Sequence, residues 1–257
     1  MLDDQQREQF ARDGFVRIPD AFDPAGMAER VWQYLAPRGI DRGDPSTWPP
    51  DTVHHLQKLR PSPAFAAIGS ATTISAVDSL LGAGAWARPK HWGQFLVTFP
   101  SPGPWVLPHR VWHADTSYLE PGEPPRGVLL FSYLDRVGPG AGGTLLLAGS
   151  HRLVPRFVAG RPALGKEPSS QSREAFFRSH RWLTDLVSEE DAAVTDPVVR
   201  RERFMTETDL DGVAVRVVDL TGEPGDIVLQ HRLVAHCAAP NCSDRARLMR
   251  VSRPMRT

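Results

Sequence analysis

The feature that most constrains the fold is a series of short apolar runs, most of them in the second half of the chain. The runs are rich in Val, Leu and Phe, and Gly, Pro and Asp residues separate them. Short runs with this spacing are typical of antiparallel strands, whereas a parallel sheet would alternate strands with helices. The sequence therefore predicts a mainly β protein built as an antiparallel sandwich or barrel. The runs cover residues 91–100, 127–137, 143–150, 212–220, 225–231 and 246–252.

Helical patterns surround these predicted strands. Asp3, with Gln6 three residues later, is a capping signature for a helix that ends at Gly14. Further helical segments follow Pro24 and Pro63, and residues 155–208 break the strand rhythm with polar, helical sequence. We therefore expect one domain over residues 1–257: a mostly helical support (1–85), two groups of strands (86–154 and 209–257) and an insertion that could act as a lid (155–208).

Composition excludes several classes of partner. The 257 residues carry 30 basic and 30 acidic side chains, and a net charge of zero argues against dedicated binding to nucleic acid or a membrane surface. Two cysteines, without a CxxC pair, cannot build a disulfide framework or a zinc-binding knuckle. No signal peptide is recognisable, and no apolar run approaches the ~18 residues of a membrane span. We expect a cytoplasmic protein, monomeric or homodimeric, that acts on a small molecule.

The stretch WHADTSYLEP, residues 112–121, places a histidine and an aspartate two residues apart. On an extended strand alternate side chains share one face, so His113 and Asp115 point the same way while Trp112 points away. Two ligands with this spacing can bind one metal ion without distorting the backbone. An isolated HxD triplet has a competing interpretation, that of polar residues on an ordinary strand.

A third ligand is expected from another strand, and residues 225–252 contain two histidines followed by a basic strand. If residues 241–244 form a hairpin turn, His236 and Arg247 become diagonal neighbours on one face, roughly 7–8 Å apart. A dicarboxylate could then bridge a metal ion and the guanidinium. His231 would face the other way, and we interpret it as a core or loop histidine.

Two histidines and one carboxylate with open positions are the ligands of non-haem Fe(II) oxygenases, and a positioned arginine suits a 2-oxo acid cosubstrate. At this point the sequence resembles the phytanoyl-CoA dioxygenase family of Fe(II)/2-oxoglutarate-dependent oxygenases. The resemblance extends over most of the chain and implies a double-stranded β-helix, a cupin-like jelly roll, with peripheral helices. It rests on four segments in the family's order, LDDQQREQFARDGFVRIPDAFDP, WHADTSYLEP, GPGAGGTLLLAGSHR and GDIVLQHRLVAHCAAPNCSDRAR.

The resemblance implies roles for individual residues. His113, Asp115 and His236 match the family's iron ligands, which are also its catalytic residues. Arg247 matches the arginine that anchors 2-oxoglutarate. Iron, 2-oxoglutarate and dioxygen are the implied cofactor and cosubstrates.

Three further positions follow from the resemblance with less support from the residues themselves, and one position departs from the family. Phe131 and Phe95 fall on strands that border the cosubstrate, and His55 aligns with a polar residue of the same pocket. The competing interpretations are core packing for the two phenylalanines and a surface helix position for His55. Ala238 stands where the family often has a hydroxyl side chain near the cosubstrate, so those hydrogen bonds differ here.

The implied reaction converts 2-oxoglutarate to succinate and CO₂ while oxidising, most simply hydroxylating, a small organic molecule such as a secondary metabolite. Related enzymes that halogenate lack the carboxylate ligand, so Asp115 favours hydroxylation, desaturation or cyclisation. Two alternatives stay open: a non-redox metal-dependent cupin enzyme and a binding protein with a vestigial metal site. In the insertion we expect either a solvated surface helix or a gate with Arg173, Arg181 and Trp182 as substrate contacts.

Overall fold

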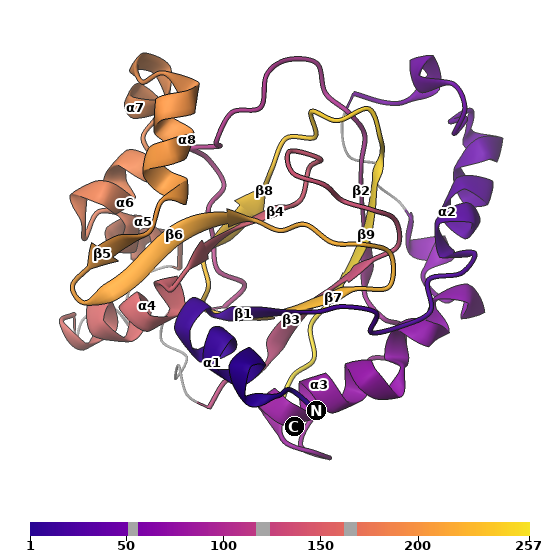
Figure 1. Cartoon of the computed structure of the whole chain (residues 1–257), viewed down its shortest axis with the longest axis horizontal. Coiled ribbons are helices and arrows are strands. Elements are labelled where there is room, and N and C mark those ends of the chain that lie inside the picture. The colour runs from indigo at the N-terminus through magenta and orange to yellow at the C-terminus, as the bar shows by residue number, and fades with distance from the viewer. Residues whose placement is uncertain (51–55, 117–123, 162–168) are drawn as a thin grey trace.

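A computed structural model describes the chain except for residues 51–55, 117–123 and 162–168. Two antiparallel sheets face each other at its centre (Figure 1), with the strand orders β1-β7-β3-β9-β2 and β5-β6-β4-β8. This arrangement confirms the predicted mainly β, jelly-roll fold with peripheral helices. The strands are β1 (Phe15–Ile18), β2 (Gln94–Thr98), β3 (Val128–Tyr133), β4 (Thr144–Ala148), β5 (Thr208–Leu210), β6 (Val213–Asp219), β7 (Ile227–His231), β8 (His236–Ala238) and β9 (Arg247–Ser252).

Side-chain alternation along the strands creates an interior between the sheets and two outer faces. On β3, Leu129 and Phe131 belong to the interior cluster, whereas Leu130 packs on the outer face of the larger sheet. On β4, Leu146 faces the interior, and it pairs with the first residue of β8, His236. The period of two therefore directs His236 into the space between the sheets.

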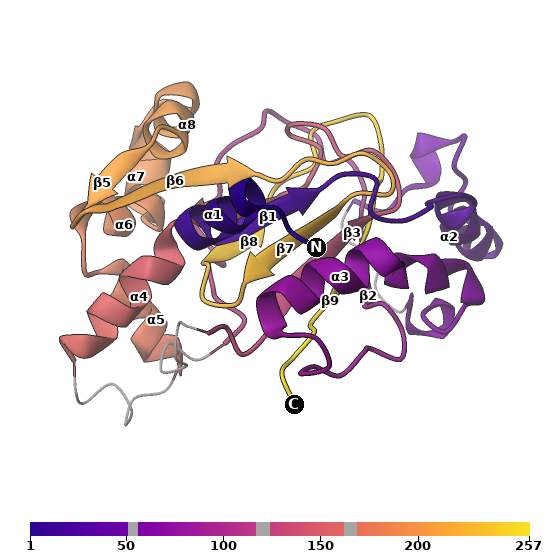
Figure 2. The same cartoon turned by 60° about the horizontal axis from the view of Figure 1, so that its bottom comes forward.

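Helices cover both outer faces (Figures 1 and 2), and the early ones gather on the larger sheet. A continuous apolar cluster joins that sheet to its helical cover. The early elements are α1 (Asp4–Asp13), α2 (Met27–Leu35), η1 (Ala36–Arg38), η2 (Pro45–Thr47), η3 (Leu56–Leu59), η4 (Pro63–Gly69) and α3 (Ala71–Leu81). Helices beside the smaller sheet begin at Ser150, five residues before the predicted start of the insertion: α4 (Ser150–Ala159), α5 (Ser169–Phe177), α6 (Arg181–Leu186), α7 (Glu189–Val194) and α8 (Pro197–Met205).

The N-terminal helix begins and ends as its sequence predicts. The Asp3 carboxylate accepts from the backbone N–H of Gln6 at 2.8 Å, and the Gln6 side chain accepts from the Asp3 N–H at 3.0 Å. Gly14 ends the helix at φ 79°, a left-handed conformation that glycine adopts without strain. Among the described residues no single helix is long and apolar enough to cross a membrane; only the bent pair η4 and α3, taken together, has that length and composition.

The predicted hairpin between the second histidine and the arginine is wrong. β8 pairs with β4 in the smaller sheet, whereas β9 pairs with β2 and β3 in the larger one. The turn itself is present, because the Asn241 side-chain amide donates to the carbonyls of Arg245 (2.8 Å) and Thr98 (3.1 Å). The segment between β8 and β9 therefore crosses from one sheet to the other, and the two strands approach the interior from opposite sides.

Candidate metal centre

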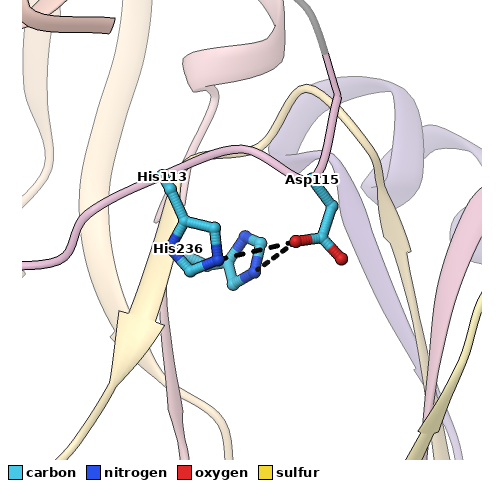
Figure 3. Close-up of side chains that lie close together, drawn as sticks. All are labelled: His113, Asp115 and His236. Carbon is cyan, nitrogen blue, oxygen red and sulfur yellow. Dashed lines mark ion pairs between the residues drawn. The ribbon is translucent and has the colours of Figure 1, made fainter. Parts of the chain in front are cut away.

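Three predicted ligands converge between the sheets. One donor atom each from His113, Asp115 and His236 lies within 4.8 Å of the others. Oδ1 of Asp115 is 3.5 Å from Nε2 of His113 and 3.7 Å from Nε2 of His236 (Figure 3). A single ion could therefore contact two imidazoles and one carboxylate, a donor set suited to Fe(II).

The two histidines are held together by their own backbones. His113 and His236 form an isolated antiparallel bridge, with N···O distances of 3.0 and 2.8 Å. The HxD segment is otherwise irregular, so the predicted extended strand is reduced to this one bridge. Val111 has a φ of 57°, unusual for a β-branched residue, and its carbonyl lies 2.8 Å from Nδ1 of His113. Donation from Nδ1 to that carbonyl leaves Nε2 with a free lone pair for a metal ion.

His236 is oriented in the same way from the opposite side of the site. Its Nδ1 lies 3.1 Å from the Val234 carbonyl and 3.1 Å from the side-chain nitrogen of Gln230. Burial, reinforced by the charge of His113, lowers the pKa of His236 to about 4. The imidazole is therefore neutral at neutral pH, the form that binds a metal.

Asp115 is held by two arginines. Nε of Arg253 donates to Oδ2 at 2.6 Å, and Arg232 donates to the Asp115 backbone carbonyl at 3.1 Å. The hydrogen bond with His113 is the main cause that lowers the pKa of Asp115 well below its usual range, and Arg253 adds to it. The same hydrogen bond raises the pKa of His113, against burial and the charge of Arg173. Asp115 thus offers a permanent negative charge to a cation.

Arg247 is a buried cation whose described neighbours include no carboxylate. It is 5% exposed and donates to Oγ1 of Thr98 at 2.6 Å and to the carbonyl of Gly142. Its Nε has no partner among the described atoms, and burial lowers its pKa to about 10. Arg247 lies on β9 two residues before Met249, which is an interior residue. Alternate residues of a strand share one face, so Arg247 also points between the sheets. A buried guanidinium with neutral neighbours favours an anionic ligand.

The other cosubstrate candidates have different environments. Phe131 is buried in the interior cluster, on the side of the sheet that carries Arg247. Phe95 instead packs with the helices, with its ring centroid 4.5 Å from the Arg250 guanidinium, and Leu96 occupies the interior-facing position of that strand. The structure therefore does not bring Phe95 to the site. His55 lies outside the described residues.

A cavity of about 730 Å³ adjoins the site, between the HxD segment and the insertion. The cavity wall includes His113 on one side and the α5 residues Arg173 and Phe177 on the other. Of the expected gate contacts, only Arg173 lines this space. Arg181 is 89% exposed and pairs with Asp185, and Trp182 is buried against Phe204.

Sequence reasoning missed the residues that support the site. Thr98, Gln230 and Arg253 have no spacing pattern relative to the ligands, since each comes from a different strand or strand end. The only signal was indirect: Thr98 follows an apolar run, where a polar side chain marks the end of a strand.

An antiparallel double sheet enclosing two histidines, a carboxylate and a buried arginine defines the class of 2-oxo-acid-dependent metal oxygenases. The chain belongs to the phytanoyl-CoA dioxygenase (PhyH) family, whose sequence pattern matches residues 10–249. It is therefore an Fe(II)/2-oxoglutarate-dependent oxygenase, with iron as its metal and 2-oxoglutarate as its cosubstrate. A comparison with curated proteins finds no match.

Solved structures with the same fold cover nearly the whole chain. EctD from S. alaskensis with bound Fe is 18% identical over 99% of this chain and 77% of its own, with a TM-score of 0.55. HygX from Streptomyces hygroscopicus, with nickel, 2-oxoglutarate and hygromycin B bound, is 18% identical over 100% of this chain and 88% of its own (TM-score 0.53). The epimerase SnoN from nogalamycin biosynthesis is 16% identical over 98% and 81% (TM-score 0.50).

Proposed function

We propose that this protein hydroxylates a C–H bond of a small organic molecule, a secondary metabolite, and releases succinate and CO₂. In this reaction one atom of O₂ enters succinate as 2-oxoglutarate loses CO₂, and the other atom enters the C–H bond. His113, Asp115 and His236 would hold the iron. Bound iron supplies the redox chemistry that activates dioxygen.

Arg247 is the observation that carries the proposal. Its guanidinium is buried, lacks a described acidic partner and points into the interior that contains the three ligands. A non-redox metal enzyme has no need of such a cation, whereas the distal carboxylate of 2-oxoglutarate would neutralise it. Thr98 and the Gly142 carbonyl fix the orientation of the guanidinium, and the apolar interior around Phe131 excludes water.

The size of the cavity supports a small-molecule substrate. A volume of about 730 Å³ lies within the roughly 300–1,000 Å³ range of sites for drug-sized ligands, and His113 is 40% exposed toward solvent through its side chain. Neighbours with the same fold are named for nogalamycin biosynthesis or carry bound hygromycin B, which supports a small organic molecule of this kind as the substrate. One of these neighbours is an epimerase and another, SnoK, is a carbocyclase. A test of hydroxylation must therefore identify the product as well as measure the consumption of 2-oxoglutarate.

The test is an anaerobic titration of the metal-free protein with Fe(II) and then 2-oxoglutarate. We expect a weak visible charge-transfer band when both are bound, and its loss in His236→Ala. The Arg247→Gln variant should bind iron yet require far more 2-oxoglutarate to develop the band. Iron binding without a band in the wild type would refute the 2-oxoglutarate site and favour a non-redox metal enzyme. A failure to bind iron would leave a binding protein with a vestigial site.

A further inference from the structure

One cationic side chain in the cavity beside the metal centre has no ion-pair partner among the described residues. Ser170, Arg173, Glu174 and Phe177 line the cavity from one face of α5, at the spacing of successive helical turns. Glu174 pairs with Arg178 at 2.7 Å, so these two charges cancel. Within the described part of the chain Arg173 has no ion pair, and it shares the cavity wall with the ligand His113.

Among the described residues, the charged side chains that contact Asp115 from the opening of the metal centre include two arginines. Arg253 and Arg232 both contact Asp115, whose carboxylate is committed to the histidines and to Arg253. Arg173 lines the same cavity as His113. The described residues at this opening thus provide no free acidic group that a cationic substrate could bind, and they provide a cation that an anion could.

We infer that the substrate carries an acidic group, a carboxylate or a phosphate, which Arg173 binds while the body of the molecule lies along the cavity toward His113. This inference rests on the proposed function, since it assigns the substrate class of the same site. The remaining wall suits an apolar or ring-containing body, because Trp112, Phe177 and Val187 line it. An arginine gives such a group a bidentate, charge-assisted contact, and its position on the insertion fixes the substrate's distance from the ligand histidine.

Arg173 is separated from the cosubstrate arginine by its place in the fold. Arg247 lies on β9 in the larger sheet, whereas Arg173 lies on α5 of the insertion beside the smaller sheet (Figure 1). At saturation, 2-oxoglutarate therefore binds Arg247, and Arg173 remains available to the substrate. This separation makes the two anion sites experimentally distinguishable.

The experiment uses the anaerobic protein loaded with Fe(II) and saturating 2-oxoglutarate, after the charge-transfer band has formed. Three probes of similar shape are titrated by calorimetry: 1-naphthaleneacetate, 1-naphthyl phosphate and the neutral 1-naphthaleneacetamide. We expect at least one of the acids to bind about tenfold more tightly than the amide, the size of one charge-assisted contact. The stronger of the two acids identifies the substrate's acidic group as a carboxylate or a phosphate.

Variants then assign the preference to one side chain. Arg173→Gln should reduce the affinity for the acid to that for the amide and leave the amide unaffected, while Arg173→Lys should retain most of the preference. Arg181→Gln is the matched control, since Arg181 is exposed, lies outside the cavity and pairs with Asp185. With Mn(II) in place of Fe(II), the proton signals of the bound acid should broaden, because the probe lies near the metal.

The outcomes separate this inference from the proposed function. If the band forms but the acids bind no better than the amide, or do not bind, the substrate inference is overturned and the oxygenase assignment stands. A preference that survives Arg173→Gln, or an acid whose signals stay sharp beside Mn(II), overturns it as well. If no band forms, the proposed function fails first.

Discussion

Nε of Arg253 donates a 2.6 Å hydrogen bond to Oδ2 of Asp115, while the other oxygen of that carboxylate, Oδ1, lies 3.5 Å from Nε2 of His113. The two oxygens therefore have different partners: one is fixed by a guanidinium and the other faces the two histidines. The carboxylate is therefore already oriented before a metal ion binds, so binding costs less conformational entropy.

Removal of Arg253 should weaken metal binding. We expect Arg253→Ala to raise the Kd for Fe(II) or Ni(II) about tenfold, because the supporting partners of metal ligands typically contribute 10- to 100-fold to affinity. The measurement is a metal titration followed by calorimetry. Arg256→Ala, three residues further along at an exposed position, is the control and should bind metal like the wild type. Equal affinities in the two variants would mean that Asp115 needs no such support.

Thr98 should contribute to the 2-oxoglutarate site through Arg247. The two residues are opposite each other on β2 and β9, and Oγ1 of Thr98 accepts from Arg247 at 2.6 Å. Thr98→Val keeps the shape but removes the acceptor, so the concentration of 2-oxoglutarate at half-saturation should rise about tenfold. Titration of the charge-transfer band measures this, with iron affinity as the internal reference. Ser101→Ala, which alters a nearby hydroxyl that contacts Asn241, should leave the value unchanged.

The strands and the HxD pair of the candidate site were predictable because their signals are local. The apolar runs, the capping pair at Asp3 and Gln6 and the HxD spacing each depend on a few consecutive residues. The order of the four motifs then predicted that His236 lies near His113. The backbone bridge between these two residues confirms that they are close.

Features set by distant pairing were not predictable. A one-residue change in strand register moves a side chain to the other face, and alternation alone cannot tell whether Phe95 or Leu96 faces inward. The same holds for β8 and β9, which are close in sequence yet belong to different sheets. Arg253 supports Asp115 from a position just past the last strand, and no sequence spacing connects those two residues.

Gln230 should support the metal through His236. Its side-chain amide nitrogen lies 3.1 Å from Nδ1 of that histidine and 3.2 Å from the Val234 carbonyl, and its Oε1 has no partner among the described atoms. With the amide turned so that Oε1 faces the ring, Gln230 accepts from Nδ1–H and keeps the ring Nε2 unprotonated for the metal. We expect Gln230→Leu to weaken metal binding about tenfold without lowering the free energy of unfolding of the metal-free protein, since leucine fills the site without polar groups to satisfy. Parallel metal titration and urea unfolding separate the two effects. A loss of stability with unchanged metal affinity would assign Gln230 to the core alone.

The metal-free protein should lose stability on acidification through two buried histidines. Burial is the main cause that lowers the pKa of His236 to about 4 and that of His151 to about 3. An unfolded chain protonates histidine near pH 6.5, so below that pH the unfolded state binds more protons than the folded one. The free energy of unfolding should therefore fall between about pH 6.5 and pH 4, with a slope of up to about 1.4 kcal/mol per pH unit for each histidine.

His113 does not add to this loss, because its hydrogen bond with Asp115 raises its pKa above that of the unfolded chain; its contribution has the opposite sign near pH 6.5 and vanishes at lower pH. Urea unfolding in a metal chelator at several pH values measures the dependence. His151→Gln should retain a hydrogen bond to the Ala11 carbonyl, which now lies 3.1 Å from Nε2 of His151, and should remove about half of the slope. A variant with the full wild-type slope would show that His151 takes up its proton as readily in the folded protein as in the unfolded chain.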